Sequence, residues 1–236
     1  MPTKKMDAKR AAKARRLEIE AAKRQARAAE RRRSWLLAGS ALGVGALLIV
    51  IVEVPRWTAP TPVANRSLTH LGVSAAKAAC SAVTSPTVEA KGDVPATTSG
   101  KATVVKYKNT PPTSGKSFTT PADNTVHFYS VGSGPAPETL VRNLQDGYTV
   151  LWYTPSLDQK QVDQLTYVGD KGSAVAQSDK FIVAPWDTKR GAFPAGKSVA
   201  LAAWGSVQFC AGVNGTTVQS FISSHPPSKA PTPTGS

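Results

Sequence analysis

The stretch PAPETLVRNLQDGYTVLWY, residues 135–153, joins a predicted helix to a predicted strand and decides the fold class. Pro137 suits the first turn of a helix, because an N–H group at that position would have no partner inside the helix. Leucine and valine then recur on one side, and Gly147 provides a natural stop. Residues 148–153 are apolar on both faces, which is typical of a central strand covered on both sides.

The same reasoning predicts further elements on both sides of this unit. Ser156 and Gln159 form a capping box for a helix that Gly169 ends. Another helix follows Asn214 and ends before a proline. The remaining predicted elements are strands over residues 102–107, 125–130, 180–185 and 198–204 and a short helix within residues 68–83. Strands and helices alternate only loosely, so we expect one α+β domain over residues 68–225, with a small mixed sheet and a few packed helices.

Charge divides the chain into unequal parts. Its 236 residues carry a net charge of +14, and residues 1–34 hold 13 Lys or Arg against four acidic residues. The other residues therefore carry only +5. The composition of the basic segment favours a solvated helix. Its lysines and arginines also attract anionic lipid headgroups by about 1 kcal/mol each near the surface. It lacks aromatic residues that stack on bases, so nucleic-acid binding is not expected.

Residues 35–54 are predicted to cross a membrane as one helix. The 18 residues from Trp35 to Val52 carry no charge. Such a helix is roughly 27 Å long, close to the hydrocarbon thickness of about 30 Å. The basic and aromatic residues that mark its ends are Arg31, Arg32, Arg33, Trp35 and Trp57. A core helix is disfavoured because the run has almost no polar stripe, and a cleaved signal peptide is disfavoured by the long basic segment before it.

The orientation of the span follows from its flanks. Six basic residues lie within residues 20–34, against two within residues 55–74, and positively charged flanks stay in the cytoplasm. We therefore expect a single-pass cell-membrane protein with a basic cytoplasmic helix at residues 1–34. A proline-containing stalk at residues 55–67 leads to the extracytoplasmic domain, and residues 226–236 form a disordered tail.

The span itself suggests one further partner. Gly39 and Gly43 form a G-x-x-x-G pattern, which lets two membrane helices approach closely. Glycine is common in membrane helices anyway, so a weak homodimer through these glycines stays an open alternative.

Cys80 and Cys210 are the only cysteines in the chain. Thiols of folded domains outside the cytoplasm tend to pair, so we expect a disulfide between them. Closing a loop of about 130 residues stabilises the folded state by about 4–5 kcal/mol on the chain-entropy argument. Two free buried thiols are the alternative, which the predicted compartment disfavours.

Motifs for catalysis are largely missing from the sequence. The three histidines are scattered and neither cysteine has a nearby ligand, so no metal-ligand spacing is present. No G-x-S-x-G motif and no phosphate-binding glycine loop occurs. Ser74 and Lys77 match S-x-x-K, but the usual partner motifs are absent. These observations predict no metal and no cofactor.

Three segments resemble a protein family of unknown function. They are NTPPTSG at residues 109–115, ETLVRNLQDGYTVLWY at residues 138–153 and AAWGSVQFC at residues 202–210. Over residues 77–223 the chain is similar to domain of unknown function 3105 (DUF3105), whose members are mainly membrane-anchored proteins of actinobacteria. The resemblance also implies a cysteine before the domain and another after the Trp-Gly pair, which match Cys80 and Cys210.

The chain departs from the family pattern at its histidines. Members typically read Pro-Pro-Thr-Ser-Gly-Pro-His, where this chain has Lys116 and Ser117 after the glycine. They typically read Leu-Val-His-Asn-Leu-Glu-His-Gly, where this chain has Arg142, Gln145 and Asp146. Imidazole and carboxylate groups gathered in this way bind metals or shuttle protons, whereas arginine stays charged and cannot ligate a metal. The resemblance implies that any such site is lost here. Arg142 and Asp146 lie four residues apart, so helical spacing predicts an ion pair between them.

The leading interpretation is a membrane-anchored cell-envelope protein whose outer domain binds an unknown envelope protein and is not an enzyme. The rival interpretation is an envelope enzyme, or a metal- or redox-binding protein, with a degenerate histidine site. Its candidate polar site comprises His127, Arg142, Gln145 and Asp146. A third interpretation makes the basic segment the working part and the outer domain a plug.

Overall fold

A four-stranded sheet forms the centre of the domain. The structure is a computed structural model that describes residues 62–233. The strands of the sheet are β5 (Thr149–Tyr153), β6 (Phe181–Pro185), β7 (Val199–Ala203) and β8 (Ser206–Cys210). Their order is β6-β5-β7-β8, with β5 parallel to β6, and with β7 antiparallel to both β5 and β8. This mixed sheet confirms the predicted α+β class.

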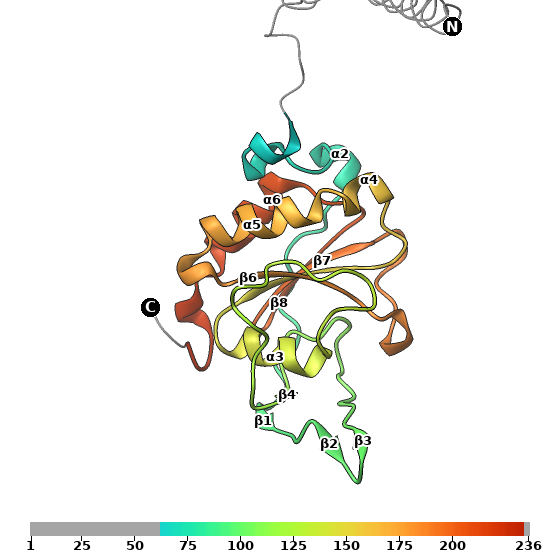
Figure 1. Cartoon of the computed structure of the whole chain (residues 1–236), viewed down its shortest axis with the longest axis vertical. Coiled ribbons are helices and arrows are strands. Elements are labelled where there is room, and N and C mark those ends of the chain that lie inside the picture. The colour runs from blue at the N-terminus through green and yellow to red at the C-terminus, as the bar shows by residue number, and fades with distance from the viewer. Residues whose placement is uncertain (1–61, 234–236) are drawn as a thin grey trace, which may run out of the picture. The chain divides into compact units, whose positions relative to one another are not determined.

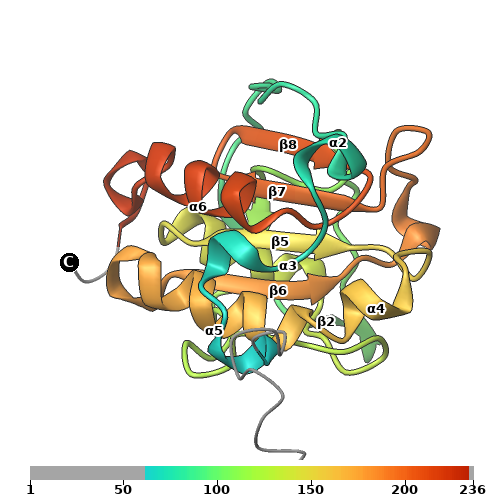
Figure 2. The same ribbon diagram turned by 90° about the horizontal axis from the view of Figure 1, so that it is seen from above.

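Helices cover both faces of the sheet. The helices are α2 (Ala75–Ala78), α3 (Pro137–Gln145), α4 (Gln159–Val162), α5 (Leu165–Val175) and α6 (Gly215–Ser224), with 3-10 turns η2 (Val63–Asn65), η3 (Leu68–His70), η4 (Gln177–Asp179), η5 (Thr188–Arg190) and η6 (Pro227–Lys229). Figures 1 and 2 show α5 and α6 on one face of the sheet and α3 on the other. Each side has its own apolar cluster, so the core has two layers.

Strand β5 supplies both layers at once. All five of its residues are buried. Leu151 and Tyr153 belong to the cluster that includes residues of α5 and α6, whereas Val150 and Trp152 belong to the cluster that includes residues of α3. Because side chains alternate across a strand, an apolar run without polar interruptions fits a strand covered on both faces. The prediction of a central strand is confirmed.

Helices α3 and α6 begin where the sequence predicts. Helix α3 has Pro137 as its first residue, and Gly147, with a φ of +92°, follows its end. Helix α6 begins after Asn214, whose Oδ1 accepts a hydrogen bond from the Thr217 N–H at 2.9 Å. The predicted strands that became β6 and β7 are confirmed as well.

The helix predicted after Ser156 is wrong at both ends. Asp158 is the N-cap of α4, and its Oδ1 accepts a hydrogen bond at 3.0 Å from the N–H two residues on. The chain then forms α5, which continues through Gly169 to Val175. A Cβ atom at Gly169 would lie 2.5 Å from the carbonyl oxygen of His127. Glycine at this position therefore permits close packing and does not end the helix.

Two predicted strands do not join the sheet as strands. Residues 125–130 make an isolated parallel bridge, between Phe128 and a residue of β6. Residues 102–107 lack a strand ladder over most of their length, and a carboxylate takes the place of a strand partner there: the Val105 N–H donates to Glu138 Oε1 at 2.7 Å. The short paired segments nearby are β1 (Gly92–Asp93) with β4 (Lys116–Ser117), in parallel, and β2 (Thr97–Thr98) with β3 (Lys101–Ala102), antiparallel.

Both edges of the central sheet are covered by other segments of the chain. Along β6, Val183 exchanges two backbone hydrogen bonds of 2.9 Å with residues 127–129. Along β8, Val207 exchanges bonds of 2.8 and 2.9 Å with Thr84, in the segment of residues 81–84. An uncovered edge is a template for pairing with another chain, so these segments shield the sheet.

Cys80 and Cys210 form the predicted disulfide, which links positions 130 residues apart. It ties the start of the segment that covers β8 to the end of β8 itself. The short helix predicted within residues 68–83 is present as α2, and Gly72, with a φ of +81°, separates it from η3. A left-handed residue of this kind interrupts a right-handed helix.

The end of the described chain differs from the predicted disordered tail at residues 226–236. Residues 227–229 form η6, and both the N–H and the hydroxyl of Thr232 donate to the carbonyl oxygen of Gln145, at 3.1 and 3.0 Å. The last carbonyl groups of a helix have no partner within it, and the tail supplies one for α3.

The predicted cytoplasmic helix at residues 1–34 and the predicted membrane span at residues 35–54 lie outside the described residues. Across residues 62–233, every helix is too short or too polar to cross a membrane.

Candidate polar site at the end of helix α3

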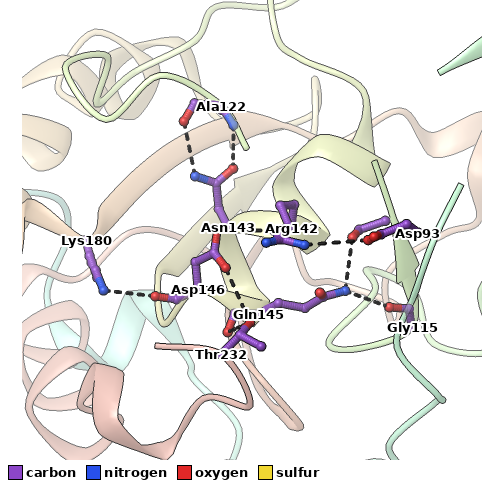
Figure 3. Close-up of polar contacts among 10 residues, drawn as sticks. Asp93, Gly115, Ala122, Arg142, Asn143, Gln145, Asp146, Lys180 and Thr232 are labelled. Carbon is purple, nitrogen blue, oxygen red and sulfur yellow. Dashed lines mark hydrogen bonds and ion pairs between the residues drawn. The ribbon is translucent and has the colours of Figure 1, made fainter. Parts of the chain in front are cut away.

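Three of the four residues of the candidate site lie together on the last turn of α3. Figure 3 shows the contacts of Arg142, Gln145 and Asp146, the last of which is the C-cap residue. Another side of the helix is apolar and packs against the sheet through Leu140 and Leu144, which are fully buried. Amphipathic packing therefore turns the polar residues towards other segments of the chain.

Arg142 bridges two carboxylates. Its Nε lies 3.3 Å from Asp146 Oδ2, and its Nη1 lies 3.5 Å from Asp93 Oδ1 in β1. The first contact is the predicted ion pair between residues four apart on the helix. The Asp93 side chain is 60% exposed, so that pair stabilises the fold by at most about 1 kcal/mol. Arg142 therefore links α3 to β1 and has a carboxylate on either side.

Gln145 holds a buried loop against the helix. The residue is 3% exposed, and its Nε2 donates to the Gly115 carbonyl oxygen at 3.1 Å and to Ser117 Oγ at 3.0 Å. Residues 111–115, which precede β4, are all buried. Both N–H groups of the amide are thus used to fix this loop, and replacing the side chain would leave buried acceptors unpaired.

Asp146 connects α3 to two further parts of the chain. Its carbonyl oxygen accepts a hydrogen bond from Lys180 Nζ at 2.9 Å, and its Oδ1 accepts one from Thr232 Oγ1 at 3.3 Å. Burial lowers the pKa of Lys180, and the negative charge of Asp146 opposes that effect. With Arg142 on Oδ2, both carboxylate oxygens of Asp146 accept from groups of the protein.

Asn143 belongs to this polar cluster, although the sequence prediction missed it. It is fully buried, its Oδ1 accepts from the Ala122 N–H at 2.8 Å, and its Nδ2 donates to the Ala122 carbonyl oxygen at 3.3 Å. The available signal was its position three residues after Leu140 and next to Leu144, which are on the apolar side of the helix. The Asn143 amide thus satisfies both backbone groups of Ala122, as a neighbouring strand would (Figure 3).

His127 does not join the other three residues of the candidate site. Its Nε2 lies 3.2 Å from Ser173 Oγ, and Ser173 belongs to α5, on the face of the sheet opposite α3. Its Nδ1 is buried and has no hydrogen-bond partner among the described residues. The four candidates therefore occupy two separate places in the fold.

A second polar cluster, at the start of α3, was also missed from the sequence. The fully buried Glu138 pairs with Arg190 at 2.7 Å and accepts the Val105 N–H at 2.7 Å through the same oxygen. Tyr107 lies nearby, and its pKa is raised mainly by burial and further by the charge of Glu138. Arg190 is 52 residues from Glu138 in the chain, so no local pattern predicts the pair.

The cluster at the end of α3 is suited to joining segments of the chain. Its groups are a guanidinium, two amides and a carboxylate, and each contacts another group of the protein. No group of three or more His, Cys, Asp or Glu positioned to hold a metal ion occurs within residues 62–233. A cationic guanidinium at its centre disfavours a bound cation.

The fold and the site define a disulfide-linked α+β domain whose mixed sheet lies between helices and whose main polar cluster is paired internally. The family profile described as protein of unknown function (DUF3105) matches residues 99–236, more than half of the chain, and the chain belongs to this family. No curated protein and no solved structure matches it.

The structure brings together the positions where the resemblance places histidine and glutamate. Ser117, in β4, contacts Gln145 at 3.0 Å, and Arg142 contacts Asp146 at 3.3 Å. Residues far apart in the sequence thus meet at one end of α3. In this chain, hydrogen bonds and an ion pair occupy that place.

Proposed function

We propose that this chain is a membrane-anchored envelope protein whose outer domain binds another envelope component and catalyses no reaction. The observation that carries the proposal is the internal pairing at Ser117, Arg142, Gln145 and Asp146, the positions where the family resemblance places histidine and glutamate.

The chemistry of these four residues supports a non-catalytic role. The Gln145 amide donates to two acceptors, and both carboxylate oxygens of Asp146 accept from protein groups. A hydroxyl at Ser117 and a guanidinium at Arg142 do not replace imidazole as metal ligands or as proton carriers near neutral pH. The four positions therefore still lie at one end of α3, but they lack the imidazole groups of the family pattern.

Two features support placement outside the cytoplasm. The disulfide Cys80–Cys210 is of the kind that persists in oxidising compartments. The uncharged run at residues 35–52, with more basic residues before it than after it, favours a signal anchor with the domain on the far side.

A reporter fused after Ser236 tests the placement. Alkaline phosphatase at that position should be active in intact cells, because it folds only outside the cytoplasm, whereas the same reporter fused after Ser34 should be inactive. The reverse result, or a mature protein trimmed behind residue 54 and found soluble, would remove the anchoring.

Metal titration of a matched set of variants tests whether this chain has lost a metal site. Thermal unfolding of the full chain in neutral detergent is followed with Zn²⁺ and with Cu²⁺. The variant S117H/R142H/Q145E/D146H restores the family residues and should gain about 2.7 kcal/mol of stability at a metal concentration of about 100 times Kd. The variant S117A/R142Q/Q145E/D146N changes the same positions without adding imidazole and should gain nothing.

Tight binding of either metal by the unchanged chain would overturn the proposal in favour of a metal protein. Equal responses of the two variants would show that the positions near the end of α3 do not form a metal site even with imidazole present. The internal pairing would then no longer support a lost function.

A further inference from the structure

Positive charge in the described domain is concentrated in one segment. Residues 91–116 contain five lysines and one acidic residue, whereas residues 117–233 contain eight basic and eight acidic residues. We call residues 91–116 the lysine lobe. Its lysines are Lys91, Lys101, Lys106, Lys108 and Lys116, all of them exposed. Nearly all the net charge of the domain therefore lies in this lobe.

Backbone pairing brings the chain segments that carry four of these lysines close together. Strands β1 and β4 pair with Gly92 opposite Lys116, so Lys91 is one position along the chain from that pair. The Tyr107 hydroxyl donates to the Lys116 carbonyl oxygen at 2.7 Å, which brings the extended segment around Tyr107 beside β4. Tyr107 is half-buried while Lys106 and Lys108 are exposed. Because side chains alternate along extended chain, these two lysines lie on the same solvent-facing side.

The acidic groups around the lobe contact other groups of the described domain. Asp93 is paired with Arg142 at 3.5 Å. Glu89 accepts the backbone N–H of Lys108 at 2.9 Å, and Glu138 is fully buried against Arg190. Within residues 62–233, no lysine of the lobe forms an ion pair with a carboxylate.

The lobe lies far from the point where the described chain begins. Figure 1 shows β1, β2 and β3 at one end of the domain and the first described residues, in blue-green, at the other. If the domain lies in the cell envelope, as the proposed function states, the partner of the lobe is an envelope component.

We propose that the lysine lobe binds a flexible anionic polymer of the envelope that carries repeated phosphate or carboxylate groups. Lysine ammonium groups are mobile point charges without the fixed fork of arginine. They therefore suit a chain of anions without one rigid geometry. Tyr107, the single aromatic residue of the lobe, is half-buried and bonded through its hydroxyl, so the lobe offers no platform for stacking bases.

Lysine footprinting of the full chain tests this binding without interference from residues 1–34. The chain in neutral detergent is acetylated with and without long-chain polyphosphate, and mass spectrometry reports the protection of each lysine separately. Polygalacturonate replaces polyphosphate in a parallel series, because it carries carboxylates instead of phosphates. The comparison set is Lys77, Lys160, Lys171 and Lys189, which lie outside the lobe in the same domain.

The expected result is protection of the lobe at lower polymer concentration than the comparison set. If the five lysines act together, the midpoint should rise about 100-fold between about 50 and 200 mM NaCl, since each neutralised phosphate releases about 0.7 counterion on a flexible chain. Protection of the lobe and the comparison set at the same polymer concentration would overturn the proposal.

A matched pair of double variants separates the lobe from the rest of the surface. K106Q/K108Q should weaken the protection of Lys91 and Lys116 by roughly 25-fold at about 0.1 M salt. K160Q/K171Q removes the same charge outside the lobe and should leave the protection of Lys91 and Lys116 unchanged. All four substituted positions are at least partly exposed, and unchanged thermal unfolding confirms that both variants fold.

Vesicles that contain anionic lipid test whether the lobe binds a membrane surface instead of a polymer. Stronger protection of the lobe by vesicles containing anionic lipid than by either polymer would replace the polymer with a membrane surface and overturn the proposal. Because footprinting is done on purified protein, its result does not depend on the reporter fusions, and failure of the polymer proposal is distinguishable from failure of the anchoring.

Discussion

The pair formed by Glu138 and Arg190 predicts a large loss of stability when its cation is removed. Glu138 is fully buried, its Oε1 accepts from both Arg190 and the Val105 N–H, and its Oε2 has no partner among the described residues. The Arg190 side chain is 22% exposed. Water therefore reaches the cation of this pair more easily than the carboxylate.

The difference in burial between the two charges determines which variant loses more stability. Arg190→Met keeps an apolar stem but leaves the buried carboxylate uncompensated, so we expect a loss of about 3–5 kcal/mol in the free energy of unfolding. Glu138→Gln keeps an acceptor for Val105 and leaves only the partly solvated arginine, at a loss of about 1 kcal/mol. The double variant E138Q/R190M contains neither charge and should be more stable than R190M by about 2 kcal/mol.

Urea unfolding of the full chain in neutral detergent, followed by tryptophan fluorescence, measures these free energies. Amide hydrogen exchange supplies a local control. The Val105 N–H should exchange faster in Glu138→Ala, whereas the Lys108 N–H, which donates to Glu89 at 2.9 Å, should stay protected. A double variant as unstable as the sum of the two single variants would refute the reasoning, because no uncompensated buried charge would then explain the loss in R190M.

Three further changes test other parts of the structure. Replacing Cys80 and Cys210 by alanine should lower the free energy of unfolding by about 5 kcal/mol, from the entropy of a loop spanning about 130 residues; unchanged urea midpoints would contradict this. Gly215→Ala places a Cβ atom 1.6 Å from the Leu68 carbonyl oxygen, so we expect a loss of about 3 kcal/mol in the same assay, and a loss under about 0.5 kcal/mol would show that the backbone shifts freely. Burial raises the pKa of Tyr107, so above about pH 10 the unfolded chain loses that proton first and stability falls as the pH rises. In Tyr107→Phe the urea midpoint should fall less steeply as the pH rises above about 10. An equally steep fall would show that other groups cause it.

The elements predicted well from the sequence are those whose pattern is local. Strand β5 is apolar at successive positions, and α3 begins with Pro137 and is followed by Gly147. Both signals act within a few residues, and the surrounding fold reinforces them. The ion pair between Arg142 and Asp146 also follows from helical spacing alone.

The elements predicted wrongly depend on partners far away in the chain. Residues 102–107 look like a strand in the sequence, but Glu138 binds a backbone N–H in this segment from another element. Gly169 resembles a helix stop, yet its lack of a side chain serves contact with His127, 42 positions earlier. The separation of His127 from Arg142 likewise depends on which face of the sheet each segment covers. Spacing within the sequence contains no information on these contacts.

The position of the disulfide has a consequence for biosynthesis. Cys80 precedes every strand of the central sheet, and Cys210 is the last residue of the last one. Because the chain is synthesised from its N-terminus, Cys80 is made before any strand of the central sheet and its partner only with the last residue of the last strand. The disulfide can therefore form only once the whole sheet has been synthesised, and a chain interrupted before residue 210 has an unpaired thiol.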